Sequence, residues 1–185
     1  MNTMNDTIKE IISQRQSTRN YSDQPVDTEK LVEICQLSCL APSSCNSQPW
    51  RLHIVQRPSP KVPKITEACQ TVGLNKFLNN VGSYIVVEQT FGNMKSKSGG
   101  FFAGNDLTPI DIGILAAHIC LAAQAEGLGT CMIGSFRRRT ILKAMEFGPL
   151  RRVRLVIAVG YPSPDDTLRT KKRKDFSETI SVVKD

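Results

Sequence analysis

The stretch that most constrains the fold is residues 109–126, PIDIGILAAHICLAAQAE, which Gly127 follows. Thr108 is a good N-cap, Pro109 suits the first helical position, and Asp111 stands three residues after Thr108, close to a capping box. Gly127 can end the helix in the left-handed conformation. The sequence therefore predicts a helix of roughly 27 Å.

Apolar residues cover most of the circumference of this predicted helix. Such a helix is buried rather than amphipathic. A membrane span is the alternative, but Asp111, His118, Gln124 and Glu126 interrupt the apolar run that a span needs. We therefore expect no membrane segment and a central core helix, with one face packed against a second copy of the chain.

Composition indicates an ordinary globular protein. A chain of 185 residues, 40% hydrophobic and 22% charged, suits one domain over residues 1–185. The N-terminal MNTMNDTIKE lacks the apolar core of a signal peptide, so we expect a cytoplasmic protein. Six cysteines without a C-x-x-C motif, together with two histidines, predict reduced, buried thiols and no metal site.

The net charge of +7 is concentrated in clusters of arginine and lysine. Such clusters suit anionic ligands or nucleic acid, although any single cluster is equally compatible with a solvated surface. The chain shows neither an aromatic stacking platform nor a known nucleic-acid motif, so we expect no nucleic-acid partner.

Hydrophobic periodicity predicts a mixture of helices and strands without βαβ alternation, which indicates the α+β class. Residues 91–107, rich in Gly, Ser, Lys and Asn, are predicted to form a loop that covers a site. Residues 163–185 are predicted to be a basic tail. The expected elements are helices at 5–16 (with Ile8, Ile11 and Ile12 on one face), 28–40, 64–72 and 137–147, strands at 50–56, 83–90 and 153–161, a short strand or turn at 129–135, and a possible short helix at 177–183.

The usual nucleotide, metal and hydrolase signatures are missing, and His53 and His118 are expected to be structural. A different group of residues follows the first helix. Arg15, Ser17 and Arg19 offer two guanidinium groups and a hydroxyl, which can hold a phosphate by charge-assisted hydrogen bonds. Alone, this R-x-S-x-R pattern also suits a phosphorylation site or a helix terminus.

Five segments resemble the nitroreductase family of FMN-dependent oxidoreductases. RQSTRNYSDQPVDTEKL is similar to the family's R-x-S-x-R-x-[FY] opening, and APSSCNSQPW to its A-P-S-x-x-N-x-Q-P-W string. NKFLNNVGSYIVV, the long helix with GLGTCMIG, and VGYPSPDDTLRTKKRKDF resemble three further family segments. The resemblance spans nearly the whole chain apart from residues 91–107.

This resemblance implies an α+β fold with a mixed or antiparallel central sheet flanked by helices. It also implies an intertwined homodimer with two FMN sites at the interface. The implied cofactor-binding residues are Arg15, Gln16, Ser17 and Arg19 at the phosphate or ring edge, Lys171 and Arg173 at the phosphate, Pro42, Ser43, Ser44 and Asn46 from the partner chain, Asn75 at the pyrimidine side, and Cys131, Met132, Ile133 and Gly134 along the ring.

The sequence departs from the family pattern at a few positions. Cys45 stands where Gly is common, and Ile133 where some relatives have an acid. The 91–107 loop is shorter than in relatives that insert helices there. Phe101 and Phe102 in this loop could cover the ring or belong to the core.

The implied activity is transfer of hydride from NADH or NADPH through FMN to a nitroaromatic, a quinone or a similar small acceptor, by a ping-pong mechanism. Arg19 is the candidate for stabilising reduced FMN near N1 and O2. The alternatives are a flavin-binding sensor or storage protein without turnover, and a specialised relative such as a dehalogenase or a flavin-fragmenting enzyme.

Overall fold

The computed structural model describes residues 4–92 and 106–184, and its centre is a four-stranded antiparallel sheet. The strand order is β1 (Trp50–Gln56), β2 (Ser83–Gln89), β4 (Arg152–Gly160) and β3 (Gly129–Ile133). Ile85 of β2 lies opposite Ile54 of β1 and Ile157 of β4. The α+β class with an antiparallel sheet is thus confirmed.

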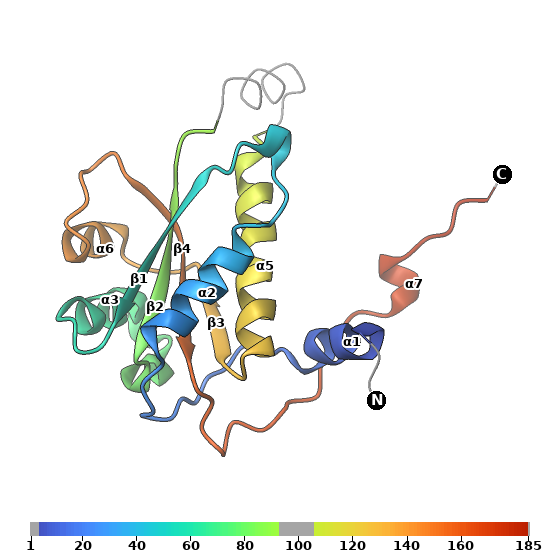
Figure 1. Cartoon of the computed structure of the whole chain (residues 1–185), viewed down its shortest axis with the longest axis horizontal. Helices are drawn as coiled ribbons and strands as arrows, with labels where there is room; N and C mark the ends of the chain where they lie inside the picture. Colours follow the sequence, from blue (N-terminus) through green and yellow to red (C-terminus); the bar gives the residue numbers. More distant parts are fainter. Residues whose placement is uncertain (1–3, 93–105, 185) are drawn as a thin grey trace.

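Helices cover both faces of this sheet, so the body has three layers (Figure 1). On one face α2 (Thr28–Ser38) and α5 (Thr108–Ala125) pack together and enclose a core that includes Ile85 and Ile157. On the other face α3 (Lys61–Cys69) and α6 (Arg138–Ala144) enclose a second core around Tyr84. Short 3-10 turns connect these elements, namely η1 (Ser44–Asn46), η2 (Thr71–Gly73) and η3 (Lys76–Asn80).

The long helix α5 begins differently from the prediction. Its N-cap is Leu107, and the backbone N–H of Thr108 donates to Asp106 Oδ1 at 3.1 Å. The predicted Thr108 cap is therefore wrong by one residue, and Pro109 occupies the second position. The C-terminal prediction is confirmed, because Gly127 has a φ of 70°.

One side of α5 is buried and the opposite side is not. The helix is long and apolar enough to cross a membrane by composition, yet the side facing α2 and the sheet is packed in the core. On the other side Ile110 is 58% exposed, and Gly113 and Ala117 are also exposed. Met132 of β3, 43% exposed, lies near this stripe and lines a hollow of about 320 Å³ with Gly113 and Ala116.

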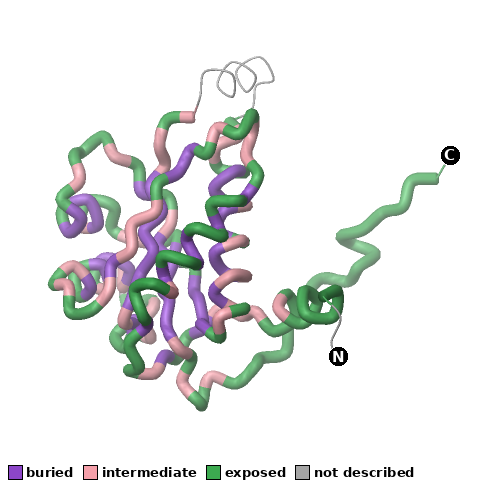
Figure 2. Tube along the Cα trace, viewed as in Figure 1, coloured by how far each residue is buried: buried purple, intermediate pink, exposed green. Residues whose placement is uncertain are grey.

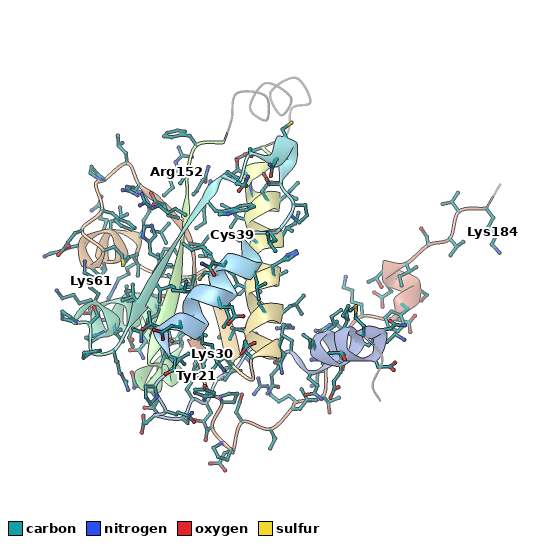
Figure 3. The ribbon with its side chains drawn as sticks, in the orientation of Figure 1. Tyr21, Lys30, Cys39, Lys61, Arg152 and Lys184 are labelled. Atoms are coloured by element: carbon teal, nitrogen blue, oxygen red, sulfur yellow. The ribbon has the colours of Figure 1, made fainter. Side chains whose placement is uncertain are left out.

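The two ends of the chain lie away from this body (Figures 1 and 2). Helix α1 (Met4–Gln14) has no buried residue, and Ile8 and Ile12 are 53% and 56% exposed. The predicted helix therefore forms, but the residues that the structure describes do not bury its apolar face. The predicted helix at 177–183 is wrong in extent, because α7 covers only Phe176–Thr179. Beyond it the tail runs outward to Lys184 (Figure 3).

The remaining boundaries differ from prediction by one to three residues, as helix ends usually do. The helix expected at 64–72 starts earlier, at Lys61, and the one at 137–147 is shorter at both ends. Of the six free cysteines, Cys39 and Cys45 are exposed, contrary to the expectation of buried thiols. Among the described residues, no group of three His, Cys, Asp or Glu side chains could hold a metal ion.

A buried ion-pair cluster fixes the segment that precedes β4. The side chain of Glu88 is 4% exposed, and Arg151 Nη1 lies 2.6 Å from its Oε1. His53 Nε2 lies 2.8 Å from Glu88 Oε2, and Phe147 packs against both His53 and Arg151. Burial raises the pKa of Glu88, but hydrogen bonds from Arg151 and His53 outweigh this effect and hold the pKa below its ordinary value.

Candidate functional site

The segment that follows α1 lies against the outer edge of β3. Ser17 pairs with Thr130 in a parallel bridge, and the N–H of Thr18 donates to the carbonyl of Thr130 at 2.9 Å. Thr18 is 2% exposed and packs against Gly129, where an added Cβ would lie 2.2 Å from Thr18 Oγ1. The missing side chain of Gly129 therefore allows Ser17 and Arg19 to sit beside this edge.

Tyr21 anchors the same segment to the start of the C-terminal tail. Its side chain is 3% exposed, and it forms an antiparallel bridge with Pro162. The N–H of Ser22 donates to the carbonyl of Tyr161 at 3.0 Å. Figure 3 shows Tyr21 at the foot of the sheet, where the tail leaves β4. The tail consequently starts beside the predicted phosphate-binding residues.

The tail then binds directly to residues 15–17 through both side chains and backbone groups. Lys171 Nζ donates to the carbonyl of Arg15 at 2.6 Å, and the guanidinium of Arg169 donates to the carbonyl of Ser17. The side-chain amide of Gln16 bonds to the tail backbone. The structure thus brings together the two groups of residues that the sequence assigned to one phosphate.

The resulting cluster carries excess positive charge. Arg169 Nη1 pairs with Asp166 Oδ1 at 2.8 Å, which neutralises one cation. Partial burial lowers the pKa of the Lys171 ammonium, and the neighbouring Arg15, Arg173 and Arg169 lower it further. A cluster of positive side chains favours the binding of an anion, because the anion forms charge-assisted hydrogen bonds with each cation.

The residues predicted along the ring form the outer edge of the sheet. Among the described residues β3 has a strand neighbour on one side only. Cys131 and Ile133 are buried, whereas Met132 and Gly134 are exposed. Burial raises the pKa of the Cys131 thiol, although Arg19 and Arg169 act in the opposite direction. Cys131 therefore presents a neutral thiol and backbone rather than a thiolate.

The loop that holds Asn75 meets the end of this strand. Thr71 Oγ1 lies 3.5 Å from Ser135 Oγ, one residue beyond Gly134. Asn75 has a φ of 57°, and its amide donates to the carbonyl of Cys69 at 2.9 Å. One of the two amide hydrogens of Asn75 thus serves its own loop.

The predicted partner-chain residues lie elsewhere in the protomer. The turn of Pro42, Ser43, Ser44 and Asn46 is fixed at the start of α5, where the N–H of Ser44 donates to Asp111 Oδ1 at 2.9 Å (Figure 1). Asp111 therefore holds this turn instead of completing a capping box. Ser43 Oγ accepts from the N–H of Gln48 at 3.0 Å, which orders the turn further.

This turn and the basic cluster are at opposite ends of α5. From Asp111 to Ala125 the helix advances roughly 21 Å at its usual rise. Thr130 and Arg15 lie beside the C-terminal half of the helix, near Cys120. A single protomer therefore does not unite the two groups of predicted cofactor-binding residues. The predicted cover loop falls mostly outside the described residues, as do Phe101 and Phe102.

Sequence reasoning missed several residues that shape the site. Gly129 could have been suspected from the G-L-G spacing, where a glycine often marks close approach of another backbone. Asp111 was noticed, but a local capping role was assigned to it. Asp166 and Arg169 had no such signal, because their partners are about 150 residues away in the chain.

The comparisons with known proteins agree with this fold. The Nitroreductase family model matches residues 12–72 and 61–161. A protein of Archaeoglobus fulgidus, provisionally named NADH dehydrogenase/NAD(P)H nitroreductase, is 31% identical over 172 residues, covering 91% of this chain and 88% of the relative. Iodotyrosine deiodinase of Drosophila melanogaster is 23% identical over 196 residues, covering 92% of this chain and 68% of the relative.

Solved structures show the same architecture. A provisionally named nitroreductase of Desulfovibrio desulfuricans, solved in complex with FMN, has a TM-score of 0.77 at 21% identity and covers 100% of this chain and 99% of its own. A nitroreductase family protein of Clostridium novyi NT has a TM-score of 0.72 at 26% identity, with 85% and 86% covered. Together with the family match over most of the chain, these likenesses establish that the protein belongs to the nitroreductase family.

Proposed function

We propose that this protein is a homodimeric FMN-dependent oxidoreductase that takes hydride from NADH or NADPH and reduces a nitroaromatic, a quinone or a similar small acceptor. The observation that carries the proposal is the basic cluster of Arg15, Lys171 and Arg173 beside the edge strand β3, with Arg19 near Cys131 of that strand. A phosphate monoester with nearly two charges fits such a cluster, and a flat ring fits the exposed edge beside it.

The dimer follows from where the remaining residues lie. The turn at residues 42–46 is far from the cluster in its own protomer, so a second chain must supply it to the site. The exposed apolar stripe of α5, with Ile110, Gly113 and Ala117, is a surface that such a second chain would cover. The solved FMN complex of a relative with the same fold supports the choice of cofactor.

The residues of this chain would bind and orient the cofactor rather than react covalently. Arg15, Ser17, Lys171 and Arg173 would hold the phosphate, and the backbone of residues 131–134 would lie along the ring. Arg19 would place positive charge where the reduced ring becomes anionic. When bound, FMN supplies the two-electron chemistry, accepting hydride from the nicotinamide and returning the electrons to an acceptor.

The first experiment tests cofactor binding. The purified protein should be yellow, or the apoprotein should shift the visible spectrum of FMN at micromolar concentrations. Anaerobic NADH or NADPH should then bleach the flavin absorbance. Flavin that binds but is reduced by neither nucleotide would favour a sensor or storage role, whereas absence of any spectral shift would overturn the proposal.

The second experiment tests the shared site. With strand β3 backing one side of the ring, donor and acceptor would use the other side in turn, so double-reciprocal plots should be parallel. Intersecting lines would reject this alternation. The acceptor panel should include a nitroaromatic, a quinone and an iodotyrosine, because one relative is named iodotyrosine deiodinase.

A further inference from the structure

The side chain of Gln16 joins two segments that are far apart in the sequence. Its Nε2 donates to the carbonyl of Thr167 at 3.1 Å and lies 3.3 Å from the carbonyl of Asp166. Its Oε1 accepts from the backbone N–H of Arg169 at 3.0 Å. A primary amide has two donor hydrogens and one acceptor oxygen, and both ends are occupied by the tail.

We propose that Gln16 is a positioning residue that latches the basic tail onto the phosphate-binding segment, and that it does not itself contact the cofactor. The inference rests on the proposed FMN function and revises the role that the family resemblance suggested for Gln16. Its amide pairs with the backbone of residues 167 and 169 as a neighbouring strand would. This pairing fixes the register in which Lys171 reaches the carbonyl of Arg15.

A latch is needed because burial holds the tail only weakly. Leu168 is 56% exposed and Arg169, Lys171 and Arg173 are exposed, so burial of apolar surface contributes little here. The clustered cations also repel each other: after desolvation, which is the larger cause, Arg15, Arg173 and Arg169 lower the pKa of Lys171 further. Neutral hydrogen bonds from Gln16 hold the tail without adding charge, so the positive field is left for the phosphate.

Asp166 completes this arrangement. Its carboxylate pairs with Arg169 at 2.8 Å, and its Oδ2 lies 3.4 Å from Gln16 Nε2. The guanidinium of Arg169 is thereby oriented to donate to the carbonyl of Ser17. Lys171 and Arg173 follow Arg169 in the tail and are the cations that we assign to the anion, and their position depends on the amide of Gln16.

The test compares Gln16→Met with Gln14→Met. Gln14 is the last residue of α1, two positions before Gln16, and its amide donates to Glu10 of the same helix rather than to the tail. Dissociation constants for FMN and for riboflavin, which lacks the phosphate, are measured on each full-length apoprotein. We expect Gln16→Met to raise the dissociation constant of FMN about 10-fold and that of riboflavin by less than about 2-fold. Gln14→Met should leave both affinities unchanged.

A double-mutant cycle shows whether Gln16 acts through the tail. If Gln16 acts through the tail, Gln16→Met should weaken FMN binding much less in the Lys171→Ala protein than in the wild type. Effects that multiply would mean that Gln16 contacts the cofactor independently, and would overturn the proposal. Equal loss of FMN and riboflavin would also overturn it, because the phosphate would then not be involved.

Hydrogen exchange of the apoprotein separates this inference from the proposed function. Without any flavin, residues 165–173 should exchange faster in Gln16→Met than in the wild type or in Gln14→Met. Unchanged exchange would refute the latch even if the protein binds FMN. Conversely, faster exchange in a protein that never binds FMN would leave the latch in place and refute its proposed purpose together with the cofactor.

Discussion

Replacing Gly129 with alanine should disturb the site more than its size suggests. The added Cβ would lie 2.2 Å from Thr18 Oγ1 and 2.8 Å from both Thr18 Cβ and Cγ2. Thr18 is 2% exposed, so its side chain has no free volume to enter. The segment must therefore move away from β3 and weaken the 2.9 Å bond from the N–H of Thr18 to Thr130. Overpacking and the lost hydrogen bond together should cost about 2–4 kcal/mol.

Thermal unfolding checks this magnitude. For a chain of this size about 1 kcal/mol shifts the Tm by roughly 2–4 °C, so a fall of about 4–16 °C is expected. Gly82→Ala is the matched control, because a Cβ at Gly82 meets nothing within 4 Å. FMN affinity should fall in Gly129→Ala alone, since Ser17 and Arg19 flank Thr18. A Tm and an FMN affinity equal to those of Gly82→Ala would refute the close-approach argument.

Three further predictions concern charge and assembly. Arg15→Ala should weaken FMN binding about 10- to 150-fold without dissociating the dimer, because a charged hydrogen bond contributes about 1.5–3 kcal/mol. Spectral titration measures this affinity, and an unchanged value would place Arg15 outside the site. Ala117→Glu should dissociate the dimer in sedimentation experiments because it buries a carboxylate in the proposed interface, whereas Lys64→Glu on the exposed side of α3 should not. Glu88→Gln should lower stability at neutral pH by about 2 kcal/mol in denaturant unfolding, because Arg151 loses its carboxylate partner. Since the folded pKa of Glu88 is depressed, the wild-type advantage should be complete above about pH 5 and shrink as the pH falls through the folded pKa; an advantage independent of pH would contradict this.

Local patterns predicted the strands and the long helix well. In β1 the alternation places Trp50, Leu52 and Ile54 together in the core beneath α2 and α5, whereas Val55 points to the other face and is buried in the core around Tyr84. In α5 the glycine that ends the helix was identified because a left-handed residue is a local requirement. These features depend on neighbours in the sequence, which is why the sequence alone was sufficient.

Features that depend on distant partners were not predictable in the same way. Asp111 has the spacing of a capping residue, yet it binds the N–H of Ser44, which lies 67 residues earlier. The sequence placed Ile8, Ile11 and Ile12 on one face of α1, yet no residue of this helix is buried within the described part of the chain. The pairing of Gln16 with Thr167 and Arg169 leaves no trace in local composition. The roles assigned to the cofactor-binding residues remain predictions, although the structure brings several of them together.

In the proposed dimer, assembly and cofactor binding would be one equilibrium. The basic cluster lies beside the C-terminal half of α5, near Cys120, and the turn held by Asp111 lies at its N-terminal end, so each complete site would need both chains. A ligand that binds only the assembled site stabilises the assembly by mass action, by about 2.7 kcal/mol per site at one hundred times its Kd. In that dimer the exposed stripe of Ile110, Gly113 and Ala117 would supply the apolar contact between chains, and the cofactor would add a bridge from one chain to the other. A substitution in the stripe or in the phosphate cluster should therefore weaken both dimer association and cofactor binding, even though the two regions share no residue.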